Sequence, residues 1–430
     1  MKDGGRLAAA IEVLTDIEER HRPAQDALRD WGLSHRFAGS GDRTAIGNLV
    51  FDAMRRRLSV SWQMDADTPR ARVLGTYCHT WQMGLEKLQK TLTDDSHAPE
   101  GLSDLEKKVL GKNLSDSAPE HIQADVPEWI WPSFVANFEG SAIEEGRALA
   151  QRAPIDMRVN TLKSTREKLL KRLSSTDVQA TPISSVGMRI APRPGGSKMP
   201  HVQAEEGFRK GWFELQDESS QIASQLVFAR PGEQVLDYCA GGGGKTLALA
   251  ADMENRGQLY AYDADKRRLA PIHERIARSG ARNIQVRSPR DNALEDLMGK
   301  MDRVLVDAPC TGTGVWRRRP DAKWRLTQKA LEDRLSEQET AITSAASFVR
   351  KGGYLVYATC SVLPEENEQQ VYSFIEENPE FEIISLGEVW QDRFGFDTAK
   401  PWSADMLSIT MTPASTNTDG FFLAVMIRND

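Results

Sequence analysis

The stretch that decides the fold is DYCAGGGGKT, Asp237 to Thr246, which directly follows the run EQVL at 233–236. Its tail is similar to the phosphate-binding pattern G-x-x-x-x-G-K-[ST], but that pattern requires glycine where Cys239 stands. The dinucleotide pattern G-x-G-x-x-G also fails, because a start at Gly241 places Thr246 at the last glycine. We therefore predict a glycine-rich turn from a strand into a helix that binds neither ATP nor a dinucleotide.

From residue 232 onward, strand-like runs alternate with segments of helix length. The runs are EQVLDYC (233–239), QLYAYDA (258–264), NIQVRS (283–288), DRVLVDAP (302–309) and GGYLVYATC (352–360). This alternation predicts an α/β fold with a parallel sheet and helices on both faces, in which ligands bind at the carboxyl ends of the strands. Two later runs, 382–390 and 420–429, are expected to add edge strands.

The sequence before residue 232 contains two regions with different patterns of apolar residues. Residues 1–128 have the apolar spacing of helices, with Asp42 as the expected cap of the second one, and predict an all-α domain. Residues 129–230 contain strand candidates at 157–162 and 187–192 with a helical segment between them, which indicates a small α+β module. Residues 231–430 then form the predicted α/β domain.

Length, charge and cysteine spacing argue against several classes of protein. A length of 430 residues suggests two or three domains. The chain has no run of about 18 apolar residues and does not begin like an export signal, so we expect a cytoplasmic protein without a membrane segment. The net charge of -7 argues mildly against nucleic acid, so any RNA contact needs a local basic surface. The four cysteines are widely spaced and form no pattern with histidine, so neither disulfides nor a bound metal are expected.

The ends of the first two strands suggest a nucleoside ligand. Asp237, Cys239 and the four glycines follow the first strand, and Asp263 ends the second, where an acid can accept hydrogen bonds from ribose hydroxyls. A glycine turn and a ribose acid without a phosphate motif suit S-adenosylmethionine. The alternative is that the glycines only form a tight turn and that Asp263 caps a helix.

The ends of the fourth and fifth strands each carry a cysteine. Cys310 lies in DAPCTGTG (307–314) and Cys360 in ATCS (358–361). Either thiol alone is explained equally well as a buried packing residue, but two at the ends of neighbouring strands indicate a reactive pair. Pro364 and the acidic residues after it predict that a helix begins shortly beyond Cys360.

Four motifs together carry a specific resemblance. DYCAGGGGKT, YAYDAD, DRVLVDAPCTGTGVWRRRPDAKWR and YATCSVLPEENE resemble the RNA 5-methylcytosine methyltransferases of the Sun/Fmu (NOL1/NOP2/sun) family, as do GWFELQDESSQ and MRVNTLK upstream. RPAQDALRDW and HRFAGSGDRTAIGNLVFDAMRR resemble the NusB-like RNA-binding domain of the bacterial rRNA enzymes in that family. The resemblance implies a Rossmann-like methyltransferase domain that acts on RNA.

The resemblance also implies roles for individual positions. Cys360 matches the nucleophile and Cys310 the residue that assists product release, with Asp307 and Lys245 beside them in the catalytic site. Two departures from the family pattern are the triple glycine in place of Ala-Pro-Gly and the absence of a clear acid after the third strand, for which Asp291 is the candidate. The positions implied to bind S-adenosylmethionine are Cys239, Ala240, Gly241, Gly242, Gly243, Gly244, Lys245, Asp263, Asp291 and Asp307.

The segment WRRRPDAKWR (316–325) interleaves basic and aromatic residues directly after the cysteine loop. This composition suits phosphate contact and base stacking, and the alternative is a solvated charged loop. Its candidate RNA-binding residues are Arg317, Arg318, Arg319, Lys323 and Arg325.

The sequence leaves three functions to compare. The resemblance favours a monomeric enzyme that methylates small-subunit (16S) rRNA, because the NusB-like extension resembles that of rRNA enzymes. A DNA cytosine-C5 methyltransferase would use Cys310 as its nucleophile and leave Cys360 idle. A non-catalytic RNA-binding or ribosome assembly factor would have no need of both cysteines with Lys245 and Asp307.

Overall fold

The computed structural model describes residues 1–111, 117–290, 292–395 and 397–429, and the chain divides into two compact units. The helical unit comprises Met1–Ala153, Pro192–Pro200 and Trp316–Arg325. The α/β unit comprises Pro154–Ala191, His201–Val315 and Leu326–Asp430. Among the described residues, no helix has both the length and the apolar character needed to cross a bilayer.

The helical unit is built around α1, α3 and α5. Leu7 and Leu14 of α1 pack against Ile46 and Val50 of α3, so the apolar spacing seen in the sequence corresponds to the buried faces of these helices. The helices are α1 (Asp3–Arg20), α2 (Ala24–Ser34), α3 (Ser40–Arg55), α4 (Arg57–Met64), α5 (Pro69–Gly75), the π-helix η1 (Thr76–Thr80), α6 (Gly84–Asp94), α7 (Asp104–Leu110), α8 (Glu120–Gln123), η2 (Glu128–Ile130), α9 (Trp131–Phe138), η3 (Glu139–Ser141), α10 (Ala142–Leu149) and α17 (Pro320–Arg325).

Two features of this unit differ from the sequence-based expectation. Asp42 does not cap the second predicted helix: α3 begins at Ser40, and Asp42 lies in its first turn, where it accepts a hydrogen bond from the Gly39 amide at 3.2 Å. The unit also extends past residue 128 to Ala153, because α9 and α10 pack within it. Gly146 of α10 lies so close to Ala124 that a Cβ there would be 2.6 Å from the alanine methyl.

The first part of the α/β unit is a small antiparallel sheet in the order β2-β3-β1-β4. It confirms the strands expected near 157–162 and 187–192 and adds two short ones. Its elements are β1 (Ile155–Val159), α11 (Arg166–Arg172), η4 (Ser174–Thr176), β2 (Gln179–Ala180), β3 (Gly187–Ile190), η5 (Val202–Ala204), α12 (Glu206–Arg209) and β4 (Phe213–Leu215).

The second part is a large sheet in the order β10-β12-β9-β8-β5-β6-β7, with β11 paired to β12. Strands β5 to β9 are parallel to their neighbours, which confirms the five predicted strands, and β12 runs antiparallel to β9. The elements are α13 (Glu218–Gln225), β5 (Gln234–Asp237), α14 (Gly244–Asp252), β6 (Gln258–Tyr262), α15 (Lys266–Leu269), α16 (Ile272–Ser279), β7 (Ile284–Arg287), η6 (Glu295–Leu297), β8 (Met301–Asp307), η7 (Thr313–Val315), α18 (Gln328–Ala346), β9 (Val349–Thr359), η8 (Pro364–Glu366), α19 (Glu368–Glu377), β10 (Phe381–Ile383), α20 (Leu386–Phe394), β11 (Ser408–Met411) and β12 (Phe421–Arg428).

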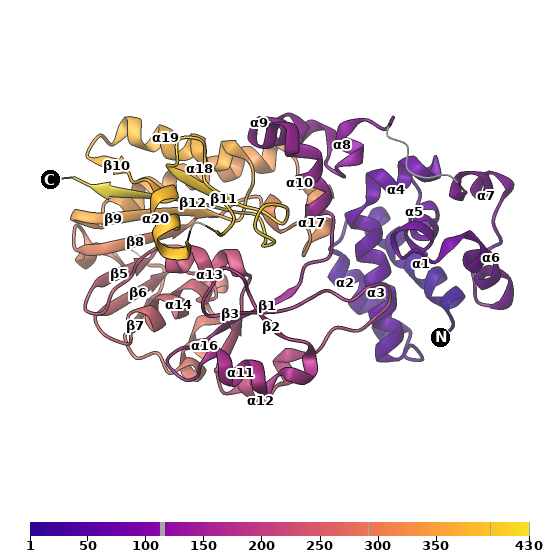
Figure 1. Ribbon diagram of the computed structural model, residues 1–430, viewed down its shortest axis with the longest axis horizontal. Coiled ribbons are helices and arrows are strands. Elements are labelled where there is room, and N and C mark those ends of the chain that lie inside the picture. Colours follow the sequence, from indigo (N-terminus) through magenta and orange to yellow (C-terminus); the bar gives the residue numbers. More distant parts are fainter. Residues whose placement is uncertain (112–116, 291, 396, 430) are drawn as a thin grey trace. The chain divides into compact units, whose positions relative to one another are not determined.

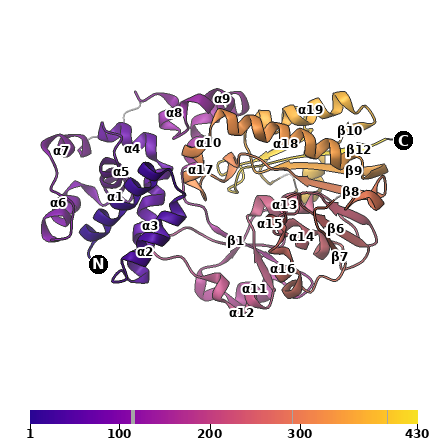
Figure 2. The same ribbon diagram turned by 180° about the vertical axis from the view of Figure 1, so that it is seen from behind.

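Both faces of the large sheet are covered by helices (Figures 1 and 2). Val304 and Val306 of β8 point to the face that α18 and α19 cover, whereas Leu305 points to the face that α13, α14 and α20 cover. Burial on both faces explains why these strands appear in the sequence as continuous apolar runs.

The expected edge strands are only partly correct. Residues 420–429 contain β12, as predicted, but of 382–390 only Glu382 and Ile383 lie in a strand. The rest begins α20, whose N-cap Ser385 accepts a hydrogen bond from the Glu388 amide. The apolar residues there include Leu386 and Trp390, four apart, which is helical spacing that the β-like composition concealed.

Candidate active site

The glycine-rich stretch forms the predicted turn between β5 and α14. Gly243 has a φ of 81°, and a Cβ there would lie 2.4 Å from the Ile272 side chain, so the position requires glycine. The carbonyl of Gly242 accepts a hydrogen bond from Arg275 at 2.8 Å, and that of Gly244 accepts one from Arg158 at 2.7 Å. Two arginines, one from α16 and one from the small sheet, therefore fix the course of the turn. The predicted cofactor residues Cys239, Ala240, Gly241, Gly242, Gly243, Gly244 and Lys245 all lie in this turn or at the start of α14.

Asp263 follows β6 and orders the same turn. One carboxylate oxygen accepts a hydrogen bond from the Gly241 amide at 2.9 Å, and the other accepts one from the Asp265 amide at 2.8 Å. Each oxygen of an ionised carboxylate has a second lone pair, so these contacts leave acceptor capacity for a ribose hydroxyl. The ribose role stays a prediction, while the backbone contacts give Asp263 a structural role that the sequence analysis treated only as an alternative.

Asp237 ends β5 at the base of the turn and is fully buried. Its Oδ2 accepts a hydrogen bond from the Thr246 hydroxyl at 2.7 Å, whereas its Oδ1 has no partner among the described residues. Burial raises the pKa of Asp237 to about 7. A buried oxygen without a partner is rare in folded proteins and fits a site that a donor group of a bound ligand completes.

Lys245 and Asp307 form an ion pair at the side of the turn. The Lys245 Nζ lies 2.6 Å from the Asp307 carboxylate and 4.7 Å from the centre of the Phe421 ring. Lys245 is buried, whereas the Asp307 side chain is 31% exposed. The pair therefore holds an accessible carboxylate at the carboxyl end of β8, two residues from the Pro309–Cys310 bond.

The two predicted reactive cysteines come together. Cys310 follows β8, Cys360 follows β9, and their Sγ atoms are 3.3 Å apart. The hydrogen bond with Cys360 and burial raise the pKa of the Cys310 thiol well above its usual value. Burial also raises the pKa of Cys239, which lies in the glycine turn. The other two described cysteines, Cys78 and Cys239, do not belong to this pair.

Close packing of the backbone fixes the position of the thiol pair. The Gly314 amide donates to the carbonyl of Cys360 at 3.0 Å, and the Gly420 amide donates to the carbonyl of Gly314 at 2.8 Å. A Cβ on Gly314 would lie 2.2 Å from the carbonyl oxygen of Gly420. Two facing glycines are required for this approach, and they join the cysteine loops to the segment between β11 and β12.

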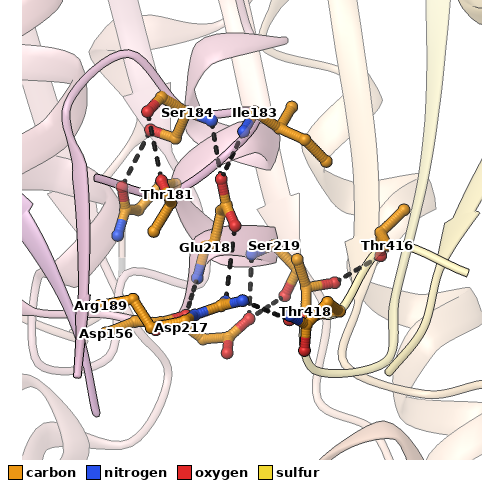
Figure 3. A network of polar contacts seen from close by, with 12 residues as sticks. Asp156, Thr181, Ile183, Ser184, Arg189, Asp217, Glu218, Ser219, Thr416 and Thr418 are labelled. Carbon is orange, nitrogen blue, oxygen red and sulfur yellow. Dashed lines mark hydrogen bonds and ion pairs between the residues drawn. The ribbon is translucent and has the colours of Figure 1, made fainter. Parts of the chain in front are cut away.

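The small sheet holds the other side of that segment (Figure 3). Arg189 of β3 forms an ion pair with Asp156 of β1 at 2.6 Å and donates to the carbonyl of Asn417 at 2.7 Å. The Asp419 amide donates to Asp217, the N-cap of α13, at 3.0 Å. Residues 412–420 are therefore held between the small sheet and the backbone behind the cysteines.

Glu366 and Gln338 were not among the residues predicted for the site. Glu366 is fully buried, and its carboxylate accepts hydrogen bonds from the Thr311 amide at 2.7 Å, the Thr311 hydroxyl and the Gln338 amide group at 2.9 Å. Gln338 of α18 also donates to the carbonyl of Pro309 at 2.9 Å. Glutamate in a first helical turn is ordinary, so the sequence contained no local signal that Glu366 contacts the loop of Cys310.

The basic segment after the cysteine loop is more buried than expected. Lys323 is 1% exposed and donates to the carbonyls of Asp125 and Arg55 at 2.7 and 3.0 Å, and burial lowers its pKa to about 8. Arg317 is 3% exposed. These two candidate RNA contacts are therefore wrong for this conformation, because both side chains lie inside the helical unit. Arg319 and Arg325 are exposed and Arg318 is half-buried.

The remaining predicted site residue, Asp291, lies outside the described residues. Within the described ranges, no cluster of three histidine, cysteine, aspartate or glutamate side chains has the arrangement of metal ligands.

Comparisons with known proteins point to one group of enzymes. Residues 225–427 match the family described as 16S rRNA methyltransferase RsmB/F, and residues 126–192 match the ferredoxin-like domain described for RsmF/B-like methyltransferases. Probable ribosomal RNA small subunit methyltransferase B from Synechocystis sp. is 27% identical over 450 residues, which cover 96% of this chain and 97% of that protein. Ribosomal RNA small subunit methyltransferase B from Yersinia pseudotuberculosis is 34% identical over 282 residues, which cover 65% of this chain and 60% of the relative. The crystal structure of a methyltransferase homologue from Pyrococcus horikoshii has a TM-score of 0.59 and 26% identity, and covers 72% of this chain and 97% of its own.

Proposed function

Residues 225–427 of this chain belong to the RsmB/F methyltransferase family, and from this premise we propose that the protein methylates C5 of a cytosine in small-subunit rRNA, with S-adenosylmethionine as the methyl donor. The observation that carries the proposal is the distance of 3.3 Å between the sulfur atoms of Cys310 and Cys360. C5 of cytosine is a weak nucleophile, and addition of a thiolate at C6 converts the C5–C6 bond into an enamine that attacks an electrophilic methyl group. A second group is then needed to help release the thiol.

The glycine turn has the features of a nucleoside site. Asp263 retains acceptor capacity for ribose hydroxyls, and the Oδ1 of Asp237, which has no partner in the described part of the chain, suits a ligand donor group. Arg158 and Arg275 hold the turn in place through hydrogen bonds to its carbonyls. When bound there, S-adenosylmethionine supplies an electrophilic methyl group.

Each of the site residues has a separate role in the proposed reaction. Cys360 adds to C6 of the cytosine as a thiolate, and C5 then bonds to the methyl group as the bond of that group to the sulfonium sulfur breaks and S-adenosylhomocysteine is left. The C5 proton passes to water, its electron pair restores the C5–C6 double bond and expels the Cys360 thiolate, and Cys310 assists as a hydrogen-bond donor to the departing sulfur. Asp307, oriented by Lys245, faces the polar edge of the base as the adduct forms. The target base must be unpaired or flipped, because C6 is shielded within a base stack.

The substrate assignment rests on the relatives and on the helical unit. The relatives from Synechocystis and Yersinia bear the name of small-subunit rRNA methyltransferases. We propose that the helical unit, of which residues 1–128 are the main part, is a NusB-like RNA-binding domain, that the small sheet within residues 129–230 belongs to a linking module and that residues 231–430 carry out the chemistry in a monomeric protein. A DNA enzyme that used Cys310 as its nucleophile is less well supported, because it would leave the neighbouring Cys360 thiol without a role.

The test is bisulfite sequencing of small-subunit rRNA from cells that lack the protein and from cells in which it is restored. We expect one cytosine to become sensitive to bisulfite in its absence and resistant again when wild-type protein, but not the Cys360→Ala variant, is supplied. A parallel assay measures transfer of a labelled methyl group from S-adenosylmethionine to total RNA and to DNA. Label on DNA alone would favour the DNA enzyme, and no label on either would favour a non-catalytic factor.

A further inference from the structure

The Glu366 side chain contacts the loop of Cys310 and therefore gives the two thiols of the pair different surroundings. Its carboxylate is fully buried and receives three donors, two of them from Thr311, the residue next to Cys310. Three donors directed at two oxygens suit an ionised carboxylate, which has no proton to donate. Gln338 bridges the arrangement, because its side chain donates both to Glu366 and to the carbonyl of Pro309 on the other side of Cys310.

The anchor is itself rigid. The Tyr357 hydroxyl of β9 donates to the backbone carbonyl of Glu366 at 2.7 Å. The next residue, Asn367, accepts from the Thr359 hydroxyl at 2.6 Å and donates to the carbonyl of Ser361 at 3.2 Å. These contacts attach the Glu366 backbone to the segment on both sides of Cys360, so one short helix, η8, connects both cysteine loops.

We propose that Glu366 is a positioning residue that makes Cys360 the nucleophile: it anchors the Pro309–Thr311 turn with a buried negative charge, so that Cys310 stays a neutral thiol and donates a hydrogen bond to the Cys360 sulfur. This inference rests on the proposed function, because only in the methyl-transfer reaction does one thiol act as the nucleophile. The difference between the two thiols concerns the protein without RNA or cofactor.

The electrostatic surroundings of Cys310 support this division. The titratable groups that face it are Tyr357 from β9, Cys360 directly after β9, Asp307 from β8 and Glu366 from η8, while α18 contributes the uncharged Gln338. Each of these groups is neutral or negative. The hydrogen bond with Cys360, burial, and the charges of Glu366 and Asp307 all raise the pKa of Cys310.

The experiment measures alkylation of each cysteine by iodoacetamide in the free protein, between pH 6 and 10, with peptide mass spectrometry as the readout. In the wild-type protein Cys360 must react before Cys310 at every pH below 9, because the thiolate is the reactive form. In Glu366→Gln, which keeps the size of the side chain and removes its charge, Cys310 should react about tenfold faster at pH 8, the effect of a shift of one pKa unit. Glu366→Asp keeps the charge and should keep Cys310 slow.

Glu377→Gln on the exposed side of α19 is the matched control, since it removes one carboxylate at a distance from the thiols. An unchanged Cys310 profile in folded Glu366→Gln overturns the proposal. If that variant does not fold, the wild-type profile decides: alkylation of Cys310 before Cys360 overturns it. Because neither RNA nor cofactor is present, failure of methyl transfer by the wild-type protein would reject the proposed function and leave this measurement independent.

Discussion

Cys310 and Cys360 are 50 residues apart in the chain, yet their sulfur atoms are separated by only 3.3 Å. The reason is the register of two neighbouring parallel strands, in which Asp307 of β8 lies beside Ala358 of β9. Cys310 lies three residues beyond Asp307, and Cys360 lies two residues beyond Ala358. The topology of the sheet therefore builds the thiol pair, and the loops that follow hold it in place.

The two cysteines should fail in different ways when they are replaced. Cys360→Ala removes the group that activates C5, so neither methylated RNA nor a covalent adduct should form. Cys310→Ala permits addition and methyl transfer but slows release, so protein should accumulate covalently attached to RNA. A denaturing gel should show a shifted band, removed by nuclease, for the Cys310 variant alone. A band for the Cys360 variant instead would transfer the nucleophile to Cys310.

Replacement of Gly314 by alanine should damage catalysis more than cofactor binding. The new Cβ would lie 2.2 Å from the Gly420 carbonyl oxygen, so the loops must separate and displace the carbonyl contact with Cys360. Misplacement of about 1 Å costs roughly a hundredfold in rate, and overpacking costs about 1 to 3 kcal/mol of stability. Gly140→Ala, where no atom lies within 4 Å of the new Cβ, is the control. Methyl transfer at the wild-type rate by Gly314→Ala would mean that the glycine contact does not position the thiols.

Asp263→Ala should weaken both the cofactor site and the turn. The substitution removes a proposed ribose acceptor and leaves the amides of Gly241 and Asp265 without their partner. We expect a loss of about 1 to 3 kcal/mol in S-adenosylmethionine binding by calorimetry. Asp263→Asn separates the two roles, because its amide oxygen still accepts one backbone hydrogen bond. Unchanged affinity in the alanine variant would reject Asp263 as a cofactor residue.

Exposed cations of segment 316–325 should affect RNA binding, whereas its buried Lys323 should affect stability. Replacement of both Arg319 and Arg325 by glutamine should reduce the slope of log affinity for RNA against log salt by up to about 2, since each phosphate contact contributes roughly one unit. Lys323→Met should leave that slope unchanged but lower the free energy of unfolding by about 1 to 3 kcal/mol, because the carbonyls of Asp125 and Arg55 lose their donor. A change of slope in the Lys323 variant, and none in the arginine pair, would contradict this division.

The sequence predicted the features that depend on local pattern and failed where partners come from distant segments. The five parallel strands, the glycine turn and the thiol pair follow from apolar runs, turn residues and the rule that strand ends converge. The burial of Lys323 could not be predicted, because its partners, Asp125 and Arg55, are about two hundred residues or more away in the chain. Residues 382–390 were predicted to form one strand because β-branched Ile383 and Ile384 precede Val389, but from Leu386 onward the segment forms α20.

The same distinction applies within the candidate site. Cys310 and Cys360 were found because each ends a predicted strand. Glu366 and Gln338 were missed because their role appears only when η8 and α18 pack against the loop of Cys310. The residues proposed to react lie in short sequence motifs, whereas the residue proposed to position them lies on an element that is near only in space.

Asp237 should make stability depend on pH in a defined direction. Its pKa in the folded protein is about 7, above the ordinary value of 3.8, because burial opposes ionisation. Well below the ordinary pKa of 3.8 the carboxyl is protonated in both states, and the protonated group makes its full contribution to the free energy of unfolding of the wild type. As pH rises to 7 the unfolded chain ionises first, so the wild type loses free energy of unfolding, on the order of 4 kcal/mol at most. Asp237→Asn has no such proton, so the free energy of unfolding of the variant relative to wild type should rise between pH 4 and 7 and then level off.

Denaturant unfolding followed by tryptophan fluorescence, at intervals of half a pH unit from 4 to 8.5, measures this difference. Thr246→Val is the second variant: the Thr246 hydroxyl donates to Asp237 and lowers its pKa, so its loss should extend the sloping region to higher pH. Asp392→Asn, an exposed carboxylate of α20, controls for the loss of one charge. Parallel curves for wild type and Asp237→Asn across the whole range would show that the buried carboxyl does not titrate in this window. The Oδ1 of Asp237 would then have to be satisfied as an ionised acceptor even in the free protein.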